Sequence, residues 1–193
     1  MDADKLIRER LHVKRGDSLP YCGYNSSRMD LIAIMAELGY KEGAEIGVCV
    51  GKFSEVLCQG IPGLHLTGVD PWTEYQVHSQ ARCDRRYAEA VARLAPHNVT
   101  IVKETSLRAS LDVADGSLDF VYIDGDHRFE AVLLDILLWE PKVRVGGMVA
   151  GHDWYAFWQS GVVQAVLAYT QGRNIGAWYI TKDREPSWLW VKK

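Results

Sequence analysis

The fold of this chain is decided by the stretch Ala44-Glu45-Ile46-Gly47-Val48-Cys49-Val50-Gly51-Lys52-Phe53-Ser54. A short apolar strand leads into a glycine turn, and a helix begins after the turn. Gly47 and Gly51 can adopt backbone angles that a Cβ forbids, and they let a ligand approach the main chain. The helix start also presents free N–H groups, which suit a carboxylate or phosphate. The stretch therefore predicts either a ligand-binding turn or a plain strand–turn–helix joint of an α/β domain.

The length and charge of the chain restrict its organisation and partners. Its 193 residues predict one domain, 1–193, that is long enough to bury a core. We divide it into residues 1–43, which form N-terminal helices and either a connector or a lid, and residues 44–193, which form the core. The net charge of −3 gives no electrostatic footprint for nucleic acid, so we expect no nucleic-acid partner.

We expect neither a secretory signal nor a membrane span. Its charged first residues have no apolar segment behind them, and no apolar run is long enough to cross a bilayer. The cysteines form no CxxC pair and show no zinc-like spacing with histidine, which is typical of reduced thiols in the cytosol. We therefore expect a cytoplasmic protein without membrane contact. The sequence leaves open whether it forms a homo-oligomer.

Apolar strands alternate with helical patterns along the core. This alternation predicts right-handed crossovers and a mostly parallel sheet with helices on both faces. A short charged turn at 182–186 joins the last two strands, so this hairpin adds one antiparallel strand. The expected fold is α/β, a Rossmann-like, doubly wound sheet of seven strands. The expected strands are 44–48, 64–70, 99–102, 118–123, 148–150, 175–181 and 187–192.

Polar or glycine residues follow each of the first five strands. In an open parallel sheet, ligands bind outside the carboxyl ends of the strands, so these residues converge on one rim. They are Gly47 to Gly51, Asp70, Glu104 with Ser106, Asp124 with Asp126 and His127, and His152 with Asp153. Asp70 follows the glycine turn by about twenty residues, where an acid can accept hydrogen bonds from an adenosine ribose. Asp70 also fits a simple turn or helix cap, and both NAD and S-adenosylmethionine agree with the pattern.

Four motifs carry a resemblance to a known family. They are Glu45 to Gly51, Gly68 to Trp72, Tyr122 to His127 and Gly146 to Trp154. Together they resemble the class I S-adenosylmethionine-dependent methyltransferases. They look most like the small-molecule and sugar O-methyltransferase branches, macrocin-type and methyltransferase family 24. The resemblance covers residues 44–155 and implies a seven-stranded sheet with an antiparallel closing hairpin.

The resemblance implies how the cofactor is held. The glycine turn would hold the methionine part, Asp70 would bind the ribose, and Ser106 would lie near the adenine. The expected cofactor-binding residues are Glu45, Gly47, Gly51, Phe53, Ser54, Asp70, Pro71, Trp72, Ser106 and Asp124. Cys49 stands where the family has its middle glycine, and its Cβ narrows the space at the turn. Glu45, inside the strand, is costly to bury without a partner.

The second half of the rim carries the expected chemistry. A hydroxyl that accepts a methyl group must lose its proton, and a bound divalent metal lowers the pKa of that hydroxyl. The resemblance to metal-dependent catechol-type enzymes implies the ligands Asp124, His152 and Asp153. Carboxylates suit Mg²⁺, whereas the imidazole suits Mn²⁺, Fe²⁺ or Zn²⁺ better, so we expect Mg²⁺ or Mn²⁺.

The expected catalytic residues are His127, Asp124 and Asp126. The same families place a base three residues after the acid of this strand, and His127 occupies that position. An unperturbed histidine has a pKa near working pH, which suits a general base. Each of these residues also has a plain structural alternative, because the two acids fit helix caps and His127 and His152 fit buried structural histidines.

The sequence therefore predicts an S-adenosylmethionine-dependent O-methyltransferase that acts on a hydroxyl of a small molecule or a sugar, with a divalent metal as a separable feature. One alternative is an NAD(P)-dependent oxidoreductase, although Cys49 breaks its tight glycine pattern. The other is a non-catalytic member of the fold that binds a nucleoside. We expect acceptor contacts from the aromatic and polar segments 21–27, 74–86 and 154–159.

Overall fold

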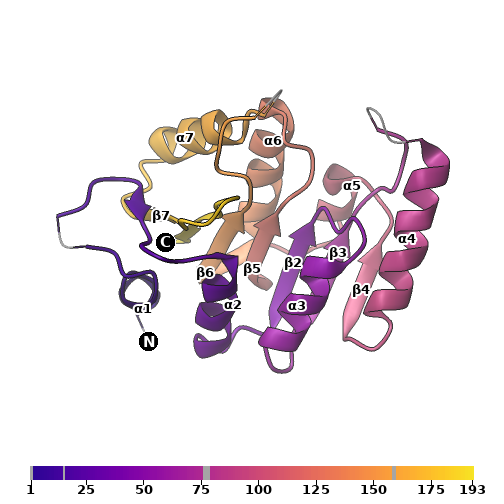
Figure 1. Cartoon of the computed structure of the whole chain (residues 1–193), viewed down its shortest axis with the longest axis horizontal. Coiled ribbons are helices and arrows are strands. Elements are labelled where there is room, and N and C mark those ends of the chain that lie inside the picture. Colours follow the sequence, from indigo (N-terminus) through magenta and orange to yellow (C-terminus); the bar gives the residue numbers. More distant parts are fainter. Residues whose placement is uncertain (1, 15, 76–78, 158–159) are drawn as a thin grey trace.

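A single eight-stranded sheet runs through the protein. The computed structural model describes residues 2–14, 16–75, 79–157 and 160–193 (Figure 1). The strand order is β1-β7-β8-β6-β5-β2-β3-β4. The strands are β1 Tyr21–Cys22, β2 Glu42–Ile46, β3 His65–Val69, β4 Val99–Val102, β5 Leu118–Ile123, β6 Val143–Gly151, β7 Trp178–Ile180 and β8 Trp188–Val191. β8 pairs antiparallel with both β6 and β7, and the other pairings of the described strands are parallel. The expected mostly parallel sheet with an antiparallel closing hairpin is confirmed.

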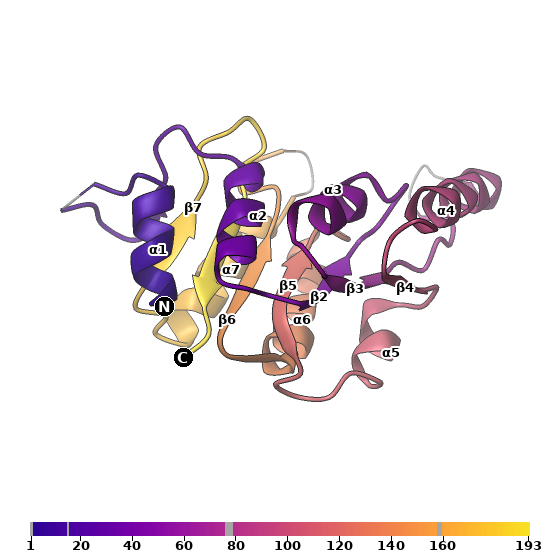
Figure 2. The same ribbon diagram turned by 90° about the horizontal axis from the view of Figure 1, so that it is seen from below.

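Helices cover both faces of the sheet (Figure 2). They are α1 Ala3–Arg10, α2 Arg28–Glu37, α3 Lys52–Gly60, α4 Gln80–Leu94, α5 Ser106–Ser110, α6 Phe129–Trp139 and α7 Val162–Gly172, with a 3₁₀ turn at Glu140–Lys142. One core cluster joins α1, α2 and α3 to the sheet, and another joins α6 and α7 to the opposite face. None of the described helices is both long and apolar enough to cross a membrane.

The central strand β5 shows why its residues 120–123 form an unbroken apolar run. Phe120 and Tyr122 pack into the cluster with α1, α2 and α3. Val121 and Ile123 pack into the cluster with α6 and α7. Successive strand side chains point to opposite faces, so a strand covered on both faces needs apolar residues at every position.

The eighth strand, β1, was not predicted. It lies in the segment 21–27, which the sequence presented as a loop or lid. Tyr21 and Cys22 pair with Tyr179 and Ile180 of β7, and the Gly23 N–H donates to the Ile180 carbonyl at 2.8 Å. These bonds attach the segment to the sheet edge. Two residues are too few to show the alternation that signals a strand.

The expected turn at 143–147 is instead part of β6. Leu118 pairs with Val143 and Phe120 pairs with Met148, so four residues of β6, 144–147, lie opposite the single residue Asp119 of β5. This bulge contains Gly146, whose φ of +79° is a left-handed conformation that favours glycine. The glycines that suggested a turn therefore shape a bulge within a longer strand.

The strand order positions the site. β3 and β4 extend from β2 in one direction, whereas β5 and β6 extend in the other, so the order reverses between β2 and β5. Ligands of open α/β sheets bind at the carboxyl ends of the strands beside such a reversal. The glycine turn follows β2, and the Asp124 segment follows β5, on the two sides of this point.

Candidate cofactor and metal site

The glycine turn is tightly constrained by its neighbour β5. Gly47 has a φ of +100°, and a Cβ there would lie 2.1 Å from the Asp124 carbonyl oxygen. Gly51 has a φ of +75° and directly precedes α3. Cys49 is also left-handed, with a φ of +54°, although it is not glycine. A side chain is strained in this conformation, which agrees with the glycine that the family resemblance implies at this middle position.

Asp70 and Trp72 hold the middle of this turn. The carboxylate of Asp70 accepts hydrogen bonds from the Cys49 N–H at 2.8 Å and from the Trp72 N–H at 2.9 Å. The indole N–H of Trp72 donates to the Cys49 carbonyl at 2.8 Å. Burial raises the pKa of Asp70, and the two backbone hydrogen bonds oppose that shift. Asp70, the acid that is expected to bind the ribose, therefore also fixes the shape of the turn.

Trp72 is itself a packing residue. Its side chain is buried and lies against Tyr87 of α4, with the ring centroids 4.9 Å apart. Pro71, between Asp70 and Trp72, is half-buried. The indole N–H of Trp72 is thus bonded to the turn, and the expected cofactor contact of this residue stays a prediction. Trp72 supports the turn.

Glu45 and Ser54 form a buried pair beneath the turn. The Ser54 hydroxyl donates to the Glu45 carboxyl group, and both residues are almost fully buried. Burial raises the pKa of Glu45 to about 8, and the Ser54 hydrogen bond opposes this shift. Ser54 is thus the partner that the sequence required, and Glu45 retains its proton at neutral pH.

Ser106 belongs to a second polar group on the other face of the sheet. Its hydroxyl donates to Asp135 at 2.5 Å and accepts from the indole N–H of Trp139 at 2.8 Å. Burial raises the pKa of Asp135 to about 6. Asp135 was not among the expected site residues, although an acid within the otherwise apolar run 131–139 is a usable signal. Asp135 and Trp139 orient the residue expected near the adenine.

Asp124, His152 and Asp153 meet at the carboxyl ends of β5 and β6. One ligand atom from each lies within 4.8 Å of the other two. His152 Nδ1 is 3.3 Å from Asp153 Oδ1 and 3.7 Å from Asp124 Oδ2. The backbone N–H of His152 also donates to the Ile123 carbonyl at 3.0 Å, and this bond joins the ends of the two strands. We call these three residues the acid–histidine cluster.

The donor set of the acid–histidine cluster fits a divalent metal. Carboxylate oxygens suit both Mg²⁺ and Mn²⁺, whereas imidazole favours transition metals. Mn²⁺ therefore fits the two carboxylates and one imidazole better than Mg²⁺ does. His152 and Asp153 are buried, and Asp124 is half-buried. Negative charge that is largely removed from water favours a bound cation.

His127 contacts the acid–histidine cluster. Its Nε2 lies 2.8 Å from Asp153 Oδ2 and 3.4 Å from Asp124 Oδ1. Burial alone would lower the pKa of His127, but hydrogen bonds to the two acids outweigh it and raise the pKa to about 10. In this arrangement His127 is a cation between carboxylates. A metal ion at the same carboxylates would oppose that positive charge and favour the neutral imidazole that a base requires.

Asp126 is not part of this arrangement. Its carboxylate forms an ion pair with Arg128 and accepts a hydrogen bond from the Tyr75 hydroxyl at 2.6 Å. Burial opposes ionisation of Asp126, but the Arg128 and Tyr75 hydrogen bonds prevail and lower its pKa. Sequence proximity to Asp124 had placed Asp126 among the catalytic residues, whereas the structure gives it partners of its own.

Aromatic side chains lie beside His127. Phe157 meets the His127 ring edge-on, with centroids 5.5 Å apart, and Tyr155 lies 4.8 Å from Phe157. Trp154 instead packs against Trp178. Residues 76–78 and 158–159 of the expected acceptor segments lie outside the described residues.

Arg28 is a polar residue near the site that the sequence analysis did not select. It begins α2, and its guanidinium lies over the ring of Phe53, 4.9 Å from the centroid. Phe53 in turn lies 4.5 Å from the Tyr122 ring. The sequence signal was weak, because an arginine after a serine cap reads as an ordinary helix start.

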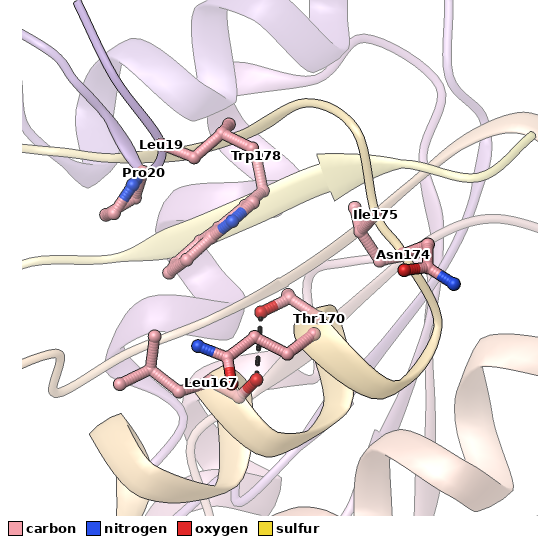
Figure 3. Close-up of a pocket in the computed structure, with 8 residues that line it drawn as sticks. Leu19, Pro20, Leu167, Thr170, Asn174, Ile175 and Trp178 are labelled. Atoms are coloured by element: carbon pink, nitrogen blue, oxygen red, sulfur yellow. Dashed lines mark hydrogen bonds between the residues drawn. The ribbon is translucent and has the colours of Figure 1, made fainter.

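A cavity of about 400 Å³ lies apart from these residues, between the segment before β1 and the end of α7 (Figure 3). It is lined by Leu19, Pro20, Leu167, Thr170, Gln171, Asn174, Ile175 and Trp178. The Thr170 hydroxyl donates to the carbonyls of Val166 and Leu167 within its own helix. The lining has no ionisable side chain, so it offers no acid–base chemistry.

Solved structures share this fold. An O-methyltransferase from Bacillus cereus in complex with SAH has a TM-score of 0.63 and 13% identity, over 99% of this chain and 90% of that chain. The O-methyltransferase TomG from Streptomyces achromogenes, in complex with SAM, has a TM-score of 0.62 and 16% identity, over 99% and 88%. A Clostridium thermocellum protein assigned as an rRNA methylase has a TM-score of 0.63 and 15% identity, over 88% and 100%.

At such identities these likenesses show the fold, whereas a sequence comparison shows the family. No protein with a curated description matches the chain. The model of methyltransferase family 24, described as a methyltransferase domain, matches residues 44–154. This match spans more than half of the 193 residues and includes the glycine turn, Asp70 and the acid–histidine cluster. The chain therefore belongs to methyltransferase family 24 and is a class I S-adenosylmethionine-dependent methyltransferase.

Proposed function

We propose that the enzyme methylates a hydroxyl group of a small molecule or a sugar, and that a divalent metal bound by Asp124, His152 and Asp153 positions that hydroxyl. The observation that carries this proposal is the acid–histidine cluster at the ends of β5 and β6. It adjoins the strand β2 that ends in the glycine turn. The O-methyltransferases of similar fold, one of them involved in tomaymycin synthesis, support a small-molecule acceptor.

The proposed site has two parts, the glycine turn and the acid–histidine cluster. The glycine turn, shaped by Asp70, would hold the cofactor, which supplies the methyl group. A bound divalent metal would lower the pKa of the acceptor hydroxyl and fix its position. Asp124, His152 and Asp153 would hold that metal.

His127 would handle the proton of the acceptor. Its Nε2 faces Asp124 and Asp153, so it lies beside the place where the acceptor oxygen would sit. A metal at the two carboxylates would favour the neutral imidazole of His127, and a neutral imidazole can accept the proton that the acceptor hydroxyl loses. Tyr155 and Phe157 would exclude water from this side and contact the acceptor.

Isothermal titration tests the proposal. S-adenosylmethionine and S-adenosylhomocysteine are titrated into the protein with Mn²⁺, with Mg²⁺ and with EDTA, and NADH is the control for the oxidoreductase alternative. We expect both adenosyl ligands to bind and NADH not to bind. Methyl transfer to a panel of phenols and sugars should then require the metal. Transfer that continues undiminished in EDTA would remove the metal from the proposal, and transfer to an amine or a carbon instead of a hydroxyl would remove O-methylation.

A further inference from the structure

The start of α2 holds Arg28 in a fixed position. Ser27 and Asp30 form a capping box, in which the Ser27 hydroxyl accepts from the Met29 N–H at 3.2 Å and Asp30 accepts from the Ser27 N–H at 2.7 Å. The backbone N–H of Arg28 also donates to Asp183 at 3.4 Å. The first residue of α2 is therefore anchored both within its own helix and to the segment between β7 and β8.

The Arg28 side chain faces the site. Its guanidinium lies over Phe53, in the first turn of α3, and α3 starts directly after the glycine turn. Its charge acts on Glu45 and on His152 of the acid–histidine cluster. Burial is the main cause of the raised pKa of Glu45, and the positive charge of Arg28 opposes it. The guanidinium thus lies at the first turn of α3, directly after the glycine turn.

Within the described part of the chain, the Arg28 guanidinium has the Phe53 ring as its contact and no carboxylate partner. The ion pairs there use other arginines, such as Arg93 with Glu55, Arg128 with Asp126 and Arg144 with Asp119. The carboxylate of Asp183 accepts from the Thr181 hydroxyl and from the backbone N–H of Arg28, not from its guanidinium. Stacking on an aromatic ring uses the face of the guanidinium and leaves its N–H edge available for a planar anion.

We infer that Arg28 binds a carboxylate of a bound ligand, either the amino-acid carboxylate of the cofactor or a carboxylate of the acceptor. This inference rests on the proposed function. An arginine fork matches a carboxylate with two parallel hydrogen bonds, which makes this pairing strong and geometrically selective. The positive end of α3, beside Phe53, favours the same negative charge. Arg28 therefore makes the site selective for an acidic ligand.

The first arm of the test asks whether the cofactor supplies the carboxylate. Wild type, Arg28→Gln and Arg28→Lys are titrated with S-adenosylhomocysteine and with 5′-methylthioadenosine, which lacks the amino-acid part. If the cofactor supplies it, Arg28→Gln weakens S-adenosylhomocysteine about 10- to 100-fold and leaves methylthioadenosine unchanged. Arg28→Lys, which keeps the charge but loses the fork, weakens it less. Arg173→Gln, which removes another guanidinium that lies over a tyrosine ring, is the matched control.

The second arm asks whether the acceptor supplies it. With S-adenosylhomocysteine and Mn²⁺ saturating, the same proteins are titrated with 3,4-dihydroxybenzoate and with catechol, which differ only in the carboxylate. If the acceptor supplies it, wild type prefers dihydroxybenzoate and Arg28→Gln loses that preference. An Arg28→Gln protein that folds as wild type and binds S-adenosylhomocysteine and dihydroxybenzoate with wild-type affinity overturns the inference. If the wild-type protein binds no S-adenosylhomocysteine, that result contradicts the proposed function and not the role of Arg28.

Discussion

The glycine turn and the acid–histidine cluster sit at the ends of adjacent strands, yet they are held by different forces. The turn is fixed by close backbone packing and by hydrogen bonds to its backbone and beneath it, from Asp70, Trp72 and the pair Glu45–Ser54. In the cluster, by contrast, charged side chains hold one another, with distances of 2.8 to 3.7 Å from its two acids to His152 and to the neighbouring His127. The turn thus has its shape without a bound ligand, whereas the charged side chains of the cluster can reorient around a bound cation.

The largest expected effect breaks the turn. Gly47→Ala places a Cβ 2.1 Å from the Asp124 carbonyl oxygen and forces alanine into a left-handed conformation. We expect the free energy of unfolding to fall by about 3 kcal/mol or more, measured by urea denaturation. Gly39→Ala is the matched control, because Gly39 is also left-handed but has open space around its Cβ position. It should cost only about 1 kcal/mol. Equal losses in the two variants would mean that close packing does not fix the turn.

The next effect removes charge from the cluster. Asp153→Asn deletes one carboxylate of the candidate metal site, so Mn²⁺ affinity should fall by more than about 100-fold, the upper range for losing an outer partner of a metal ligand. Electron paramagnetic resonance of free Mn²⁺ measures this. Asp126→Asn, in a carboxylate that pairs with Arg128, is the control and should bind Mn²⁺ as wild type does. A normal affinity in Asp153→Asn would contradict the assigned ligands.

A smaller expected effect is the pH dependence of stability that Glu45, beneath the turn, causes. The pKa of Glu45 rises from an ordinary 4.5 to about 8 on folding, so between these values the folded chain holds a proton that the unfolded chain releases. Stability therefore falls as pH rises through this window and levels off above pH 8. Glu45→Gln should remove that slope, which approaches ~1 kcal/mol per pH unit. Urea denaturation from pH 5 to 8 measures it, and parallel curves for the two proteins would show that Glu45 ionises freely.

The smallest effect loosens the turn without breaking it. Trp72→Phe keeps an aromatic ring against Tyr87 but loses the hydrogen bond to the Cys49 carbonyl. We expect a loss of about 1 kcal/mol in stability and a weaker affinity for S-adenosylhomocysteine, both measurable by denaturation and calorimetry. Mn²⁺ affinity should stay unchanged. A variant that instead weakens Mn²⁺ binding would show that the two regions are not independent.

The sequence predicted the parts of the fold and site that depend on strand order and strand ends. Parallel strands bring their carboxyl ends to one rim, so Asp124, His152 and Asp153 were expected to lie together from the sequence alone. It could not predict side-chain direction within a loop, which is why Asp126 was grouped with Asp124 although it pairs with Arg128.

Other parts of the structure leave weak or no signals in the sequence. The two-residue strand β1 carries no periodicity, and its place depends on backbone bonds to β7. Asp135 and Arg28 act through contacts between elements far apart in the chain, with Ser106 and with Phe53. Such contacts become visible only when the helices are packed on the sheet.

The central claim is that the glycine turn and the acid–histidine cluster form one site, with the cofactor methyl group close to the metal. It is tested most directly by nuclear magnetic resonance of S-adenosylmethionine labelled with ¹³C at the methyl group and bound to the protein. Paramagnetic Mn²⁺ should broaden the methyl signal beyond detection in wild type, whereas diamagnetic Mg²⁺ should leave it sharp and Asp153→Asn should preserve it in Mn²⁺. A methyl signal equally sharp with Mn²⁺ and Mg²⁺ in wild type would contradict the account.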